Sequence, residues 1–166
     1  EGLALAAFGL IRDFARNPLA QSVTAYVMQD EARHVAFGRI ALRDYYPHLT
    51  DKERDEREEF VVEGCYLMRD RFLGDEVWET LGLPVQECKE WVDRSELMRV
   101  YRGNLFSRIV PTIKDIGLWG PRVRKAYADM GILGLADGDL DAMASADEKF
   151  AEKLGRPVLP LAGAGA

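Results

Sequence analysis

Histidine and cysteine are both scarce in this sequence, which contains only His34, His48, Cys65 and Cys88 of these types. The two cysteines form neither a CxxC pair nor a framework of several disulfides, and this argues against a small secreted domain held together by disulfides. No signal or transit segment is visible in the sequence either. We therefore expect a protein of the reducing cytoplasm.

Long apolar runs and an excess of positive charge are also missing. No segment stays apolar over the roughly 20 residues that a membrane-spanning helix needs, and the formal net charge is −6. We therefore expect neither a membrane nor a nucleic acid as a partner. With 166 residues, of which 48% are hydrophobic, the chain is long enough to build one domain with an apolar core.

Apolar residues recur at helical spacing along most of the chain, and no segment has the alternation of a strand. The sequence therefore predicts an all-α fold. Asn17 and Pro18 are typical of a helix start, and Thr50 is expected to cap a third long helix. Helices are expected over residues 1–16, 18–46, from 51 onward, 75–81, 85–93, 95–118 with a kink at Pro111, 121–130 and 140–154.

Two further features have a structural interpretation. The run DKERDEREE, residues 51–59, places opposite charges four positions apart, as in Lys52/Glu56 and Arg54/Glu58, and such a run is typical of a solvated helix face. The tryptophans are expected to close the core where the short helices pack, and they are Trp78, Trp91 and Trp119.

One stretch of the predicted second helix, QDEARHVAFG at residues 29–38, carries Asp, Glu, Arg and His within five consecutive positions. Neighbours on a helix lie about 100° apart, so these side chains cannot all face water. Glu31 and His34 are three positions apart and point to one side, along an otherwise apolar stripe. A carboxylate and an imidazole in this E-x-x-H arrangement hold metals in helical bundles. Alone, the pair is equally consistent with a lone buried ion pair.

Glu1 offers a third donor at the same level. If the chain reverses at residue 17, Glu1 lies 16 residues before the turn, and Glu31 and His34 lie 14 and 17 residues after it. At about 1.5 Å per residue, the three side chains stand roughly 21–25 Å from the turn on two antiparallel helices. A carboxylate-rich site with one imidazole favours iron, or else manganese, over zinc.

The spacing of Glu1 and of Asp30-Glu31-Ala32-Arg33-His34 resembles one half of the four-helix site in the ferritin-like di-iron carboxylate superfamily. Its members include ribonucleotide reductase small subunits, bacterial multicomponent monooxygenases and amine N-oxygenases. In this superfamily each half supplies a Glu from one helix and an E-x-x-H from the next, and the two halves hold two irons. The resemblance implies that Glu1, Glu31 and His34 are iron ligands within the second half of a ferritin-like helical bundle.

The resemblance also implies roles for Asp30 and Arg33. Asp30 would accept a hydrogen bond from the metal-bound His of the other half, and Arg33 would pair with the equivalent Asp there. Such partners fix the orientation of a ligating imidazole. The alternative for these two residues is a local i,i+3 pair on the surface.

An apolar lining beside the metals is expected from the same two helices, although each member could also be ordinary core. Gly38 either lets a neighbouring helix approach closely, which we favour, or leaves room for a substrate. The expected lining residues are Leu5, Phe8, Thr24, Val27, Met28, Val35 and Gly38. We expect residues 1–50 to form the second helix pair, residues 51–154 to add helices that complete or cover the bundle, and residues 155–166 to form a flexible tail.

The sequence departs from the family pattern because it has no second E-x-x-H, since Tyr45 stands three positions before His48. It also begins in mid-pattern at Glu1, so we expect either the C-terminal portion of a longer bundle or a chain that pairs as a homo-oligomer. The implied function is a di-iron oxidase or oxygenase that uses O₂ and a small organic substrate, with electrons from a reductase. The alternatives are a ferritin-like iron-oxidising protein and a helical scaffold without a functional metal.

Overall fold

The computed structural model of the chain describes residues 2–154, and every regular element in this range is helical. The predicted all-α class is confirmed, whereas the expected tail at 155–166 lies outside the described residues. Within residues 2–154, no helix is both long and apolar enough to cross a membrane. The elements are α1 (Gly2–Phe14), α2 (Pro18–Tyr45), η1 (Tyr46–His48), α3 (Asp51–Arg71), α4 (Asp75–Thr80), α5 (Val85–Arg94), α6 (Glu96–Phe106), α7 (Ile109–Asp115), α8 (Pro121–Asp129), η2 (Leu133–Asp137) and α9 (Leu140–Leu154).

Two long helices begin at the caps that the sequence predicts. The side chain of Asn17 accepts a hydrogen bond from the Leu19 amide at 2.9 Å, and Pro18 occupies the first turn of α2. Thr50 and Glu53 form a reciprocal capping box at the start of α3. These contacts satisfy backbone N–H groups that have no partner within their own helix.

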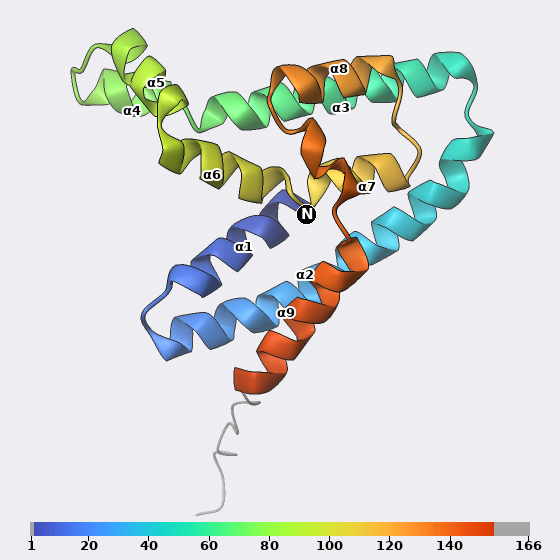
Figure 1. The fold of residues 1–166 in the computed structure, drawn as a ribbon, viewed down its shortest axis with the longest axis horizontal. Coiled ribbons are helices and arrows are strands. Elements are labelled where there is room, and N and C mark those ends of the chain that lie inside the picture. Colours follow the sequence, from blue (N-terminus) through green and yellow to red (C-terminus); the bar gives the residue numbers. More distant parts are fainter. Residues whose placement is uncertain (1, 155–166) are drawn as a thin grey trace, which may run out of the picture.

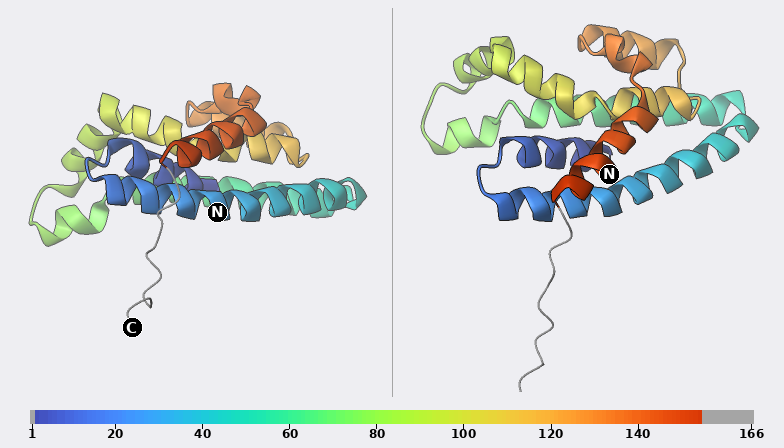
Figure 2. Two further views of the ribbon diagram at one scale, coloured as in Figure 1. Left: turned by 90° about the horizontal axis from the view of Figure 1, so that it is seen from below. Right: turned by 60° about the horizontal axis from the view of Figure 1, so that its bottom comes forward.

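The helices form two neighbouring regions (Figure 1). The hairpin region consists of residues 2–45 and 140–154, in which α1 and α9 both pack on the long helix α2. The α3–α8 region consists of residues 51–71 and 106–137, in which α8 packs on α3 and η2 packs on α7. The short helices α4 and α5 lie beyond the C-terminal end of α3, and α6 returns from them toward α1 (Figures 1 and 2).

The α3–α8 region has a closed apolar core. Its fully buried members come from α3, α6, α7, α8 and the turn before η2, and they are Cys65, Phe106, Val110, Val123, Tyr127 and Ile132. The Cys65 sulfur lies 3.6 Å from the Tyr127 hydroxyl. Because burial disfavours the charged forms, the pKa values of both groups are raised. Trp119 packs against Tyr127 with ring centroids 5.8 Å apart.

The predicted kink at Pro111 is wrong, because the chain breaks upstream of it. Helix α6 ends at Phe106 and α7 starts at Ile109, so that Pro111 falls in the first turn of a new helix. A proline inside a continuous helix would leave the carbonyl four residues earlier without its partner, whereas a first turn needs no such bond. Proline therefore sets where α7 can begin.

Two other expectations about side chains are also wrong. Trp91 is 73% exposed on α5, although Trp78 and Trp119 are partly buried as expected. Lys52 and Glu56 form the expected exposed pair at 3.8 Å, but Glu58 is only 5% exposed and does not form the expected pair with Arg54. Its carboxylate instead accepts a hydrogen bond of 2.8 Å from the Gly120 amide at the start of α8. The close packing of α8 on α3 buries this one position of the charged run.

Candidate functional site

Glu31 and His34 lie next to each other on α2, as their spacing predicts. Glu31 Oε2 is 3.6 Å from His34 Nδ1, and the two side chains are 27% and 62% exposed. The pair therefore stands at the edge of the hairpin region, with the carboxylate half-sheltered and the imidazole largely in the open. Neither α1 nor α9 covers the imidazole.

The separation of these two donors suits one metal ion. Two neighbouring donors that each bind an ion at about 2.1 Å lie roughly 3.0–3.6 Å apart. A third protein ligand is still needed, and Glu1, the predicted one, lies outside the described residues. Gly2, which follows it, lines a hollow together with Val35 and Gly38. Within residues 2–154, no three His, Cys, Asp or Glu side chains gather as a potential metal-binding group.

Asp30 and Arg33 pair with each other at the surface. Arg33 Nη1 donates to Asp30 Oδ1 at 2.9 Å, and the side chains are 76% and 73% exposed respectively. This is the local i,i+3 arrangement that the sequence offered as the alternative. Because both side chains are exposed, they are also free to exchange this contact for one on another helix pair.

The residues expected to line a pocket fall into separate groups. Leu5 and Met28 are buried between α1 and α2, at 3% and 1% exposure, and Phe8 is half-buried beside them. Thr24 donates its hydroxyl to the Ala20 carbonyl of its own helix at 2.7 Å, and Val27 is 37% exposed. Met28 also lines a hollow between α2 and α9, whereas Val35 and Gly38 line a separate hollow.

That hollow, called here the α2–α7 hollow, lies between α2 and α7 and has a volume of about 220 Å³. Among residues 2–154, a Cβ atom added to Gly38 would meet nothing within 4 Å outside its own helix. The favoured interpretation of Gly38, close approach of a neighbouring helix, is therefore wrong. The other interpretation, that this glycine leaves room, agrees with the structure.

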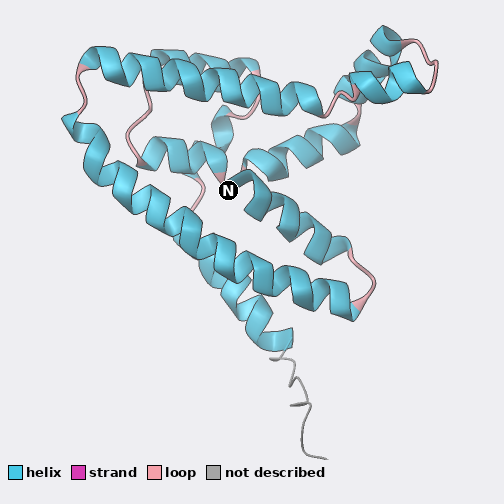
Figure 3. Ribbon diagram, turned by 180° about the vertical axis from the view of Figure 1, so that it is seen from behind, coloured by secondary structure: helices cyan, strands magenta, loops and turns pink. Residues whose placement is uncertain are grey.

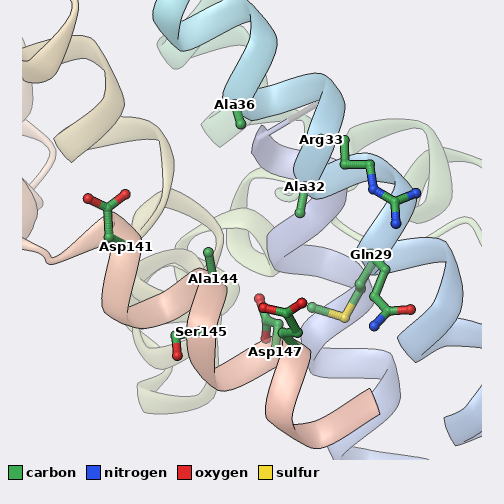
Figure 4. A pocket seen from close by; sticks show the side chains of 10 residues that line it. Gln29, Ala32, Arg33, Ala36, Asp141, Ala144, Ser145 and Asp147 are labelled. Carbon is green, nitrogen blue, oxygen red and sulfur yellow. The ribbon is translucent and has the colours of Figure 1, made fainter. Parts of the chain in front are cut away.

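A second hollow of about 390 Å³ lies between α2 and α9 (Figure 4). Arg33 reaches over it from α2, while Asp141 and Asp147 line it from α9. Arg33 is paired with Asp30, and Asp141 is bonded to Arg39. Most of its charged groups are thus engaged with residues outside the hollow, and they do not converge on a common point within it.

A buried ion cluster that the sequence did not predict joins α9 to the rest of the molecule. Asp147 is 7% exposed and receives hydrogen bonds from Arg12 at 2.9 Å and from Arg108 at 2.5 Å. Burial by itself would lower the pKa of Arg12, but hydrogen bonds to Asp13 and Asp147 outweigh burial and raise this pKa. Arg12, Asp147 and Arg108 are far apart in the sequence, and only their positions on otherwise apolar helix faces mark them.

The side of α2 that carries His34 presents an exposed apolar stripe, called here the open face. Its members recur at spacings that bring them to one side of the helix, and Asp30 and His34 stand among them. The large apolar side chains of the open face are Leu19 (71% exposed), Val23 (54%), Val27 (37%), Phe37 (77%) and Tyr45 (55%). Asp30 and His34 separate Val27 from Phe37, so the exposed apolar side chains form two groups along this side of α2. Large exposed apolar patches often mark interaction sites. Figure 3 shows α2 from behind as one long uninterrupted helix.

The chain was compared with protein-family models, with curated proteins and with solved structures. No protein-family model, no curated protein and no solved structure matches the chain.

Proposed function

We propose that the chain provides one half of a di-iron carboxylate site and acts, when the site is complete, as an O₂-dependent oxidase or oxygenase. The observation that carries this proposal is the position of Glu31 and His34, 3.6 Å apart on α2, with His34 on the open face and Glu31 half-sheltered beside it. A lone ion pair needs no such surroundings. A metal site that is closed by a second helix pair does need them, because a dry wall has to surround it.

The proposal extends to the fold of the complete protein. Helices α1 and α2 would be the second helix pair of a ferritin-like bundle, and α3 to α9 would be additional helices that cover its outer side. Glu1, Glu31 and His34 would hold iron, with manganese as the alternative metal. Asp30 would leave Arg33 and accept a hydrogen bond from an imidazole of the other half.

The metals would supply the oxidising chemistry, since two ferrous ions can reduce O₂ by two electrons. The protein's share is different. Glu31 and His34 would fix the ions, and Val27 and Phe37 would exclude water once a second helix pair covers them. A separate reductase would provide electrons, and the substrate would be a small organic molecule.

A second copy of the chain is one source for the missing half. Two copies related by a two-fold axis would bring together two Glu and two E-x-x-H segments, which matches the six ligands of the family. The open face would then be buried against its own equivalent, as in any isologous interface. A further helix pair of a longer polypeptide would serve in the same way.

The test is iron stoichiometry measured against oligomeric state for the 166-residue chain. We expect a monomer to bind iron poorly and a dimer to bind two irons, which Glu31→Ala and His34→Ala would both abolish. The exposed His48 offers a matched control, because His48→Ala removes an imidazole away from the pair. A monomer that holds two irons tightly would refute the half-site proposal, and a dimer without iron would favour a helical scaffold.

Oxygen consumption then separates the two metal-dependent functions. Ferrous iron alone would be consumed with O₂ by a ferritin-like iron-oxidising protein, whereas an oxygenase would couple O₂ use to an added organic substrate. Asp30→Asn should weaken iron binding by roughly tenfold to a hundredfold, because the loss of an outer-shell partner commonly has this effect. Complete loss of iron would instead make Asp30 a ligand.

A further inference from the structure

A hollow of about 510 Å³, called here the arginine hollow, lies where α6 meets the C-terminal ends of α3, α5 and α8 (these helices are labelled in Figure 1). The charged residues that line it are Arg69, Arg94, Arg99, Arg102, Asp93 and Asp129. Because four arginines stand against two aspartates, the wall has a formal charge of +2 in a chain whose net charge is −6. A local excess of positive charge favours an anion as the ligand.

Two of the four arginines have an ordinary structural explanation. Arg69 and Arg94 lie in the last turns of α3 and α5, where the helix dipole favours a cation, and each pairs with a carboxylate of its own helix. Arg99 is the fourth residue of α6, nearer the N-terminal end of that helix, and Arg102 lies in its middle. The helix dipole gives a cation no support at these two positions. The arginines of α6 therefore need another explanation.

Arg102 is held firmly at the wall of the hollow. Its Nη1 donates to Asp93 Oδ1 at 2.8 Å and its Nη2 donates to the Asp93 carbonyl at 2.9 Å, and the side chain is 17% exposed. A guanidinium has five N–H donors in a planar fork, so these two hydrogen bonds engage only part of them. Because the side chain is already fixed, little further side-chain entropy is lost when it binds an anion.

Arg99 has a partner that it can exchange for a ligand. Its Nη2 lies 3.1 Å from Glu96 Oε1 on the same helix, and the two side chains are 74% and 82% exposed. Exposed ion pairs of this kind contribute little to stability. Arg99 and Arg102 are three positions apart and lie on one side of α6. Arg99 can therefore leave Glu96 and turn toward an anion that Arg102 holds.

The two aspartates of the wall are each paired with a cation. Asp93 accepts from Arg102, as described above, and Asp129 Oδ2 accepts from Lys125 Nζ at 2.6 Å. These pairs reduce the repulsion that the carboxylates would exert on an anion in the hollow. The excess of arginine therefore determines the sign of the ligand's charge.

The rest of the wall is apolar, and one of its positions lacks a side chain. Met130, Ile132 and Leu135 line the hollow beside the arginines. Gly103 lines it from the interior of α6, where glycine lowers helix stability relative to alanine. Among residues 2–154, a Cβ atom at Gly103 would meet nothing within 4 Å outside its own helix, so close packing does not explain this glycine. The missing side chain leaves room for an organic group beside the guanidinium groups.

We propose that the arginine hollow binds a small phosphate monoester. Arg99 and Arg102 hold the phosphate group, and the organic group lies beside Gly103 against Met130. The dianionic phosphate matches the charge of the wall, and its oxygens match the planar N–H fork of arginine. The site lies on α3, α5, α6 and the end of α8 and uses none of the proposed metal ligands. This inference therefore goes beyond the proposed function and does not depend on it.

The test is a titration with phenyl phosphate at about pH 7.5, where a phosphate ester is mostly dianionic. The NMR signals of ¹³C-labelled methionine and isoleucine methyl groups report the binding. We expect saturable shifts at Met130 and Ile132, and none at Ile11, which is 53% exposed on α1. Inorganic phosphate, which lacks the ring, and benzenesulfonate, which carries a single charge, should each bind at least about tenfold more weakly. The absence of saturable shifts at Met130, or equal binding of either anion, would overturn the proposal.

Substitution of an arginine connects the binding to this hollow. Arg99→Gln should weaken phenyl phosphate binding by about tenfold or more, because it removes a charge-assisted hydrogen bond. Arg122→Gln is the matched control, since it removes the same charge from α8 at a side chain that pairs with Asp55 and Glu59 and does not line the hollow. Its affinity should equal that of the unaltered chain. Equal losses in the two variants would indicate a general effect of charge and refute the proposal.

A second pair of variants, at Gly103, separates charge from size. Gly103→Glu brings a carboxylate within reach of Arg99, four positions earlier, and should weaken phenyl phosphate binding by about tenfold relative to Gly103→Gln. The two new side chains have nearly the same size. Both are better helix formers than glycine, so we expect both variants to fold. Equal affinities of the two variants for phenyl phosphate would overturn the proposal.

Discussion

The two regions of this molecule bury different chemistry. The α3–α8 region is closed around apolar residues, with Phe106, Val110 and Val123 all at 1% exposure or less. The hairpin region buries Leu5 and Met28, and its Arg12 and Asp147 also form a buried ion cluster with Arg108 of the α3–α8 region. It also leaves large apolar side chains of α2 in contact with water, as α3 does with Phe60 and Leu67, which are 73% and 65% exposed. The α3–α8 region nevertheless has a closed apolar core, whereas the hairpin region buries a mixture of apolar side chains and ions.

This difference indicates that different interactions stabilise the two regions. Apolar burial stabilises a fold without reference to direction, whereas a buried ion cluster depends on every member being in place. The α3–α8 region can therefore serve as a foundation. The hairpin region relies on a few specific contacts, such as those of the buried Asp147.

The largest effect is expected from removing the central carboxylate of the hairpin region. Asp147→Ala would leave Arg108 without its carboxylate partner and Arg12 with Asp13 alone, and we expect a loss of about 3–5 kcal/mol in the free energy of unfolding. Asp141→Ala on the same helix is the control, because this side chain is 85% exposed and its pair with Arg39 should contribute at most about 1 kcal/mol. Urea unfolding measures both. Equal small losses would mean that the cluster is not a structural requirement.

A matched pair of leucines tests the contrast between a closed and an open surface. Leu118 is 1% exposed beside Tyr46 and Ile116, and Leu118→Ala should cost about 2–5 kcal/mol. Leu19 is 71% exposed on the open face, and Leu19→Ala should change stability by less than about 0.5 kcal/mol in the monomer. A large loss at Leu19 in urea unfolding, dependent on protein concentration, would instead reveal that the open face is already paired.

Substituting alanine for two glycines, Gly120 and Gly38, should change the stability of the fold in opposite directions. A Cβ at Gly120 would collide with both carboxylate oxygens of Glu58, so Gly120→Ala should destabilise the α3–α8 region by about 1–3 kcal/mol. Gly38→Ala should stabilise α2 by about 0.5–1 kcal/mol, because the added methyl group meets open space and reduces the flexibility of the unfolded chain. Thermal unfolding followed by circular dichroism gives both values. Destabilisation by Gly38→Ala would contradict the open space around it.

The Cys65–Tyr127 pair should have the smallest effect on the free energy of unfolding near neutral pH. This effect should grow only at alkaline pH. Burial raises both pKa values above their ordinary 9.0 and 10.0, so the folded chain keeps protons that the unfolded chain releases. Stability is therefore unaffected below about pH 9 and falls as the pH rises beyond it. Urea midpoints between pH 7.5 and 10.5 measure this fall. Tyr127→Phe removes one of the two groups and should make it shallower, whereas an unchanged slope would rule out this origin.

Much of the fold could be predicted because local signals determine it. Asn17 with Pro18, and Thr50 with Glu53, start helices through contacts within a few residues, and these starts agree with the structure. The break before Pro111 does not follow from the sequence, because the same proline permits a kink or a new first turn. The burial of Trp91 and Glu58 depends on which helix packs on them, and periodicity within one helix does not carry that information.

The candidate site divides in the same way. The proximity of Glu31 and His34 follows from helical spacing alone, and the structure has them 3.6 Å apart. The wall that α7 builds opposite Gly38 involves contacts between residues about 70 positions apart in the sequence. The Arg12–Asp147 contact spans 135 positions. Pairings at such distances depend on tertiary packing, which no local pattern specifies.

The length of α2 has a mechanical consequence. With 28 residues it is about 42 Å long, roughly twice the length of the 13-residue α1 beside it. Its far half is fastened to α7 through Arg39 and Arg43, which both approach Asp115. Glu31 and His34 sit on the same stiff rod, one to two turns from this anchor. A shift of α7 in the α3–α8 region would therefore move Glu31 and His34 together with α2. The distance between the two side chains would stay the same.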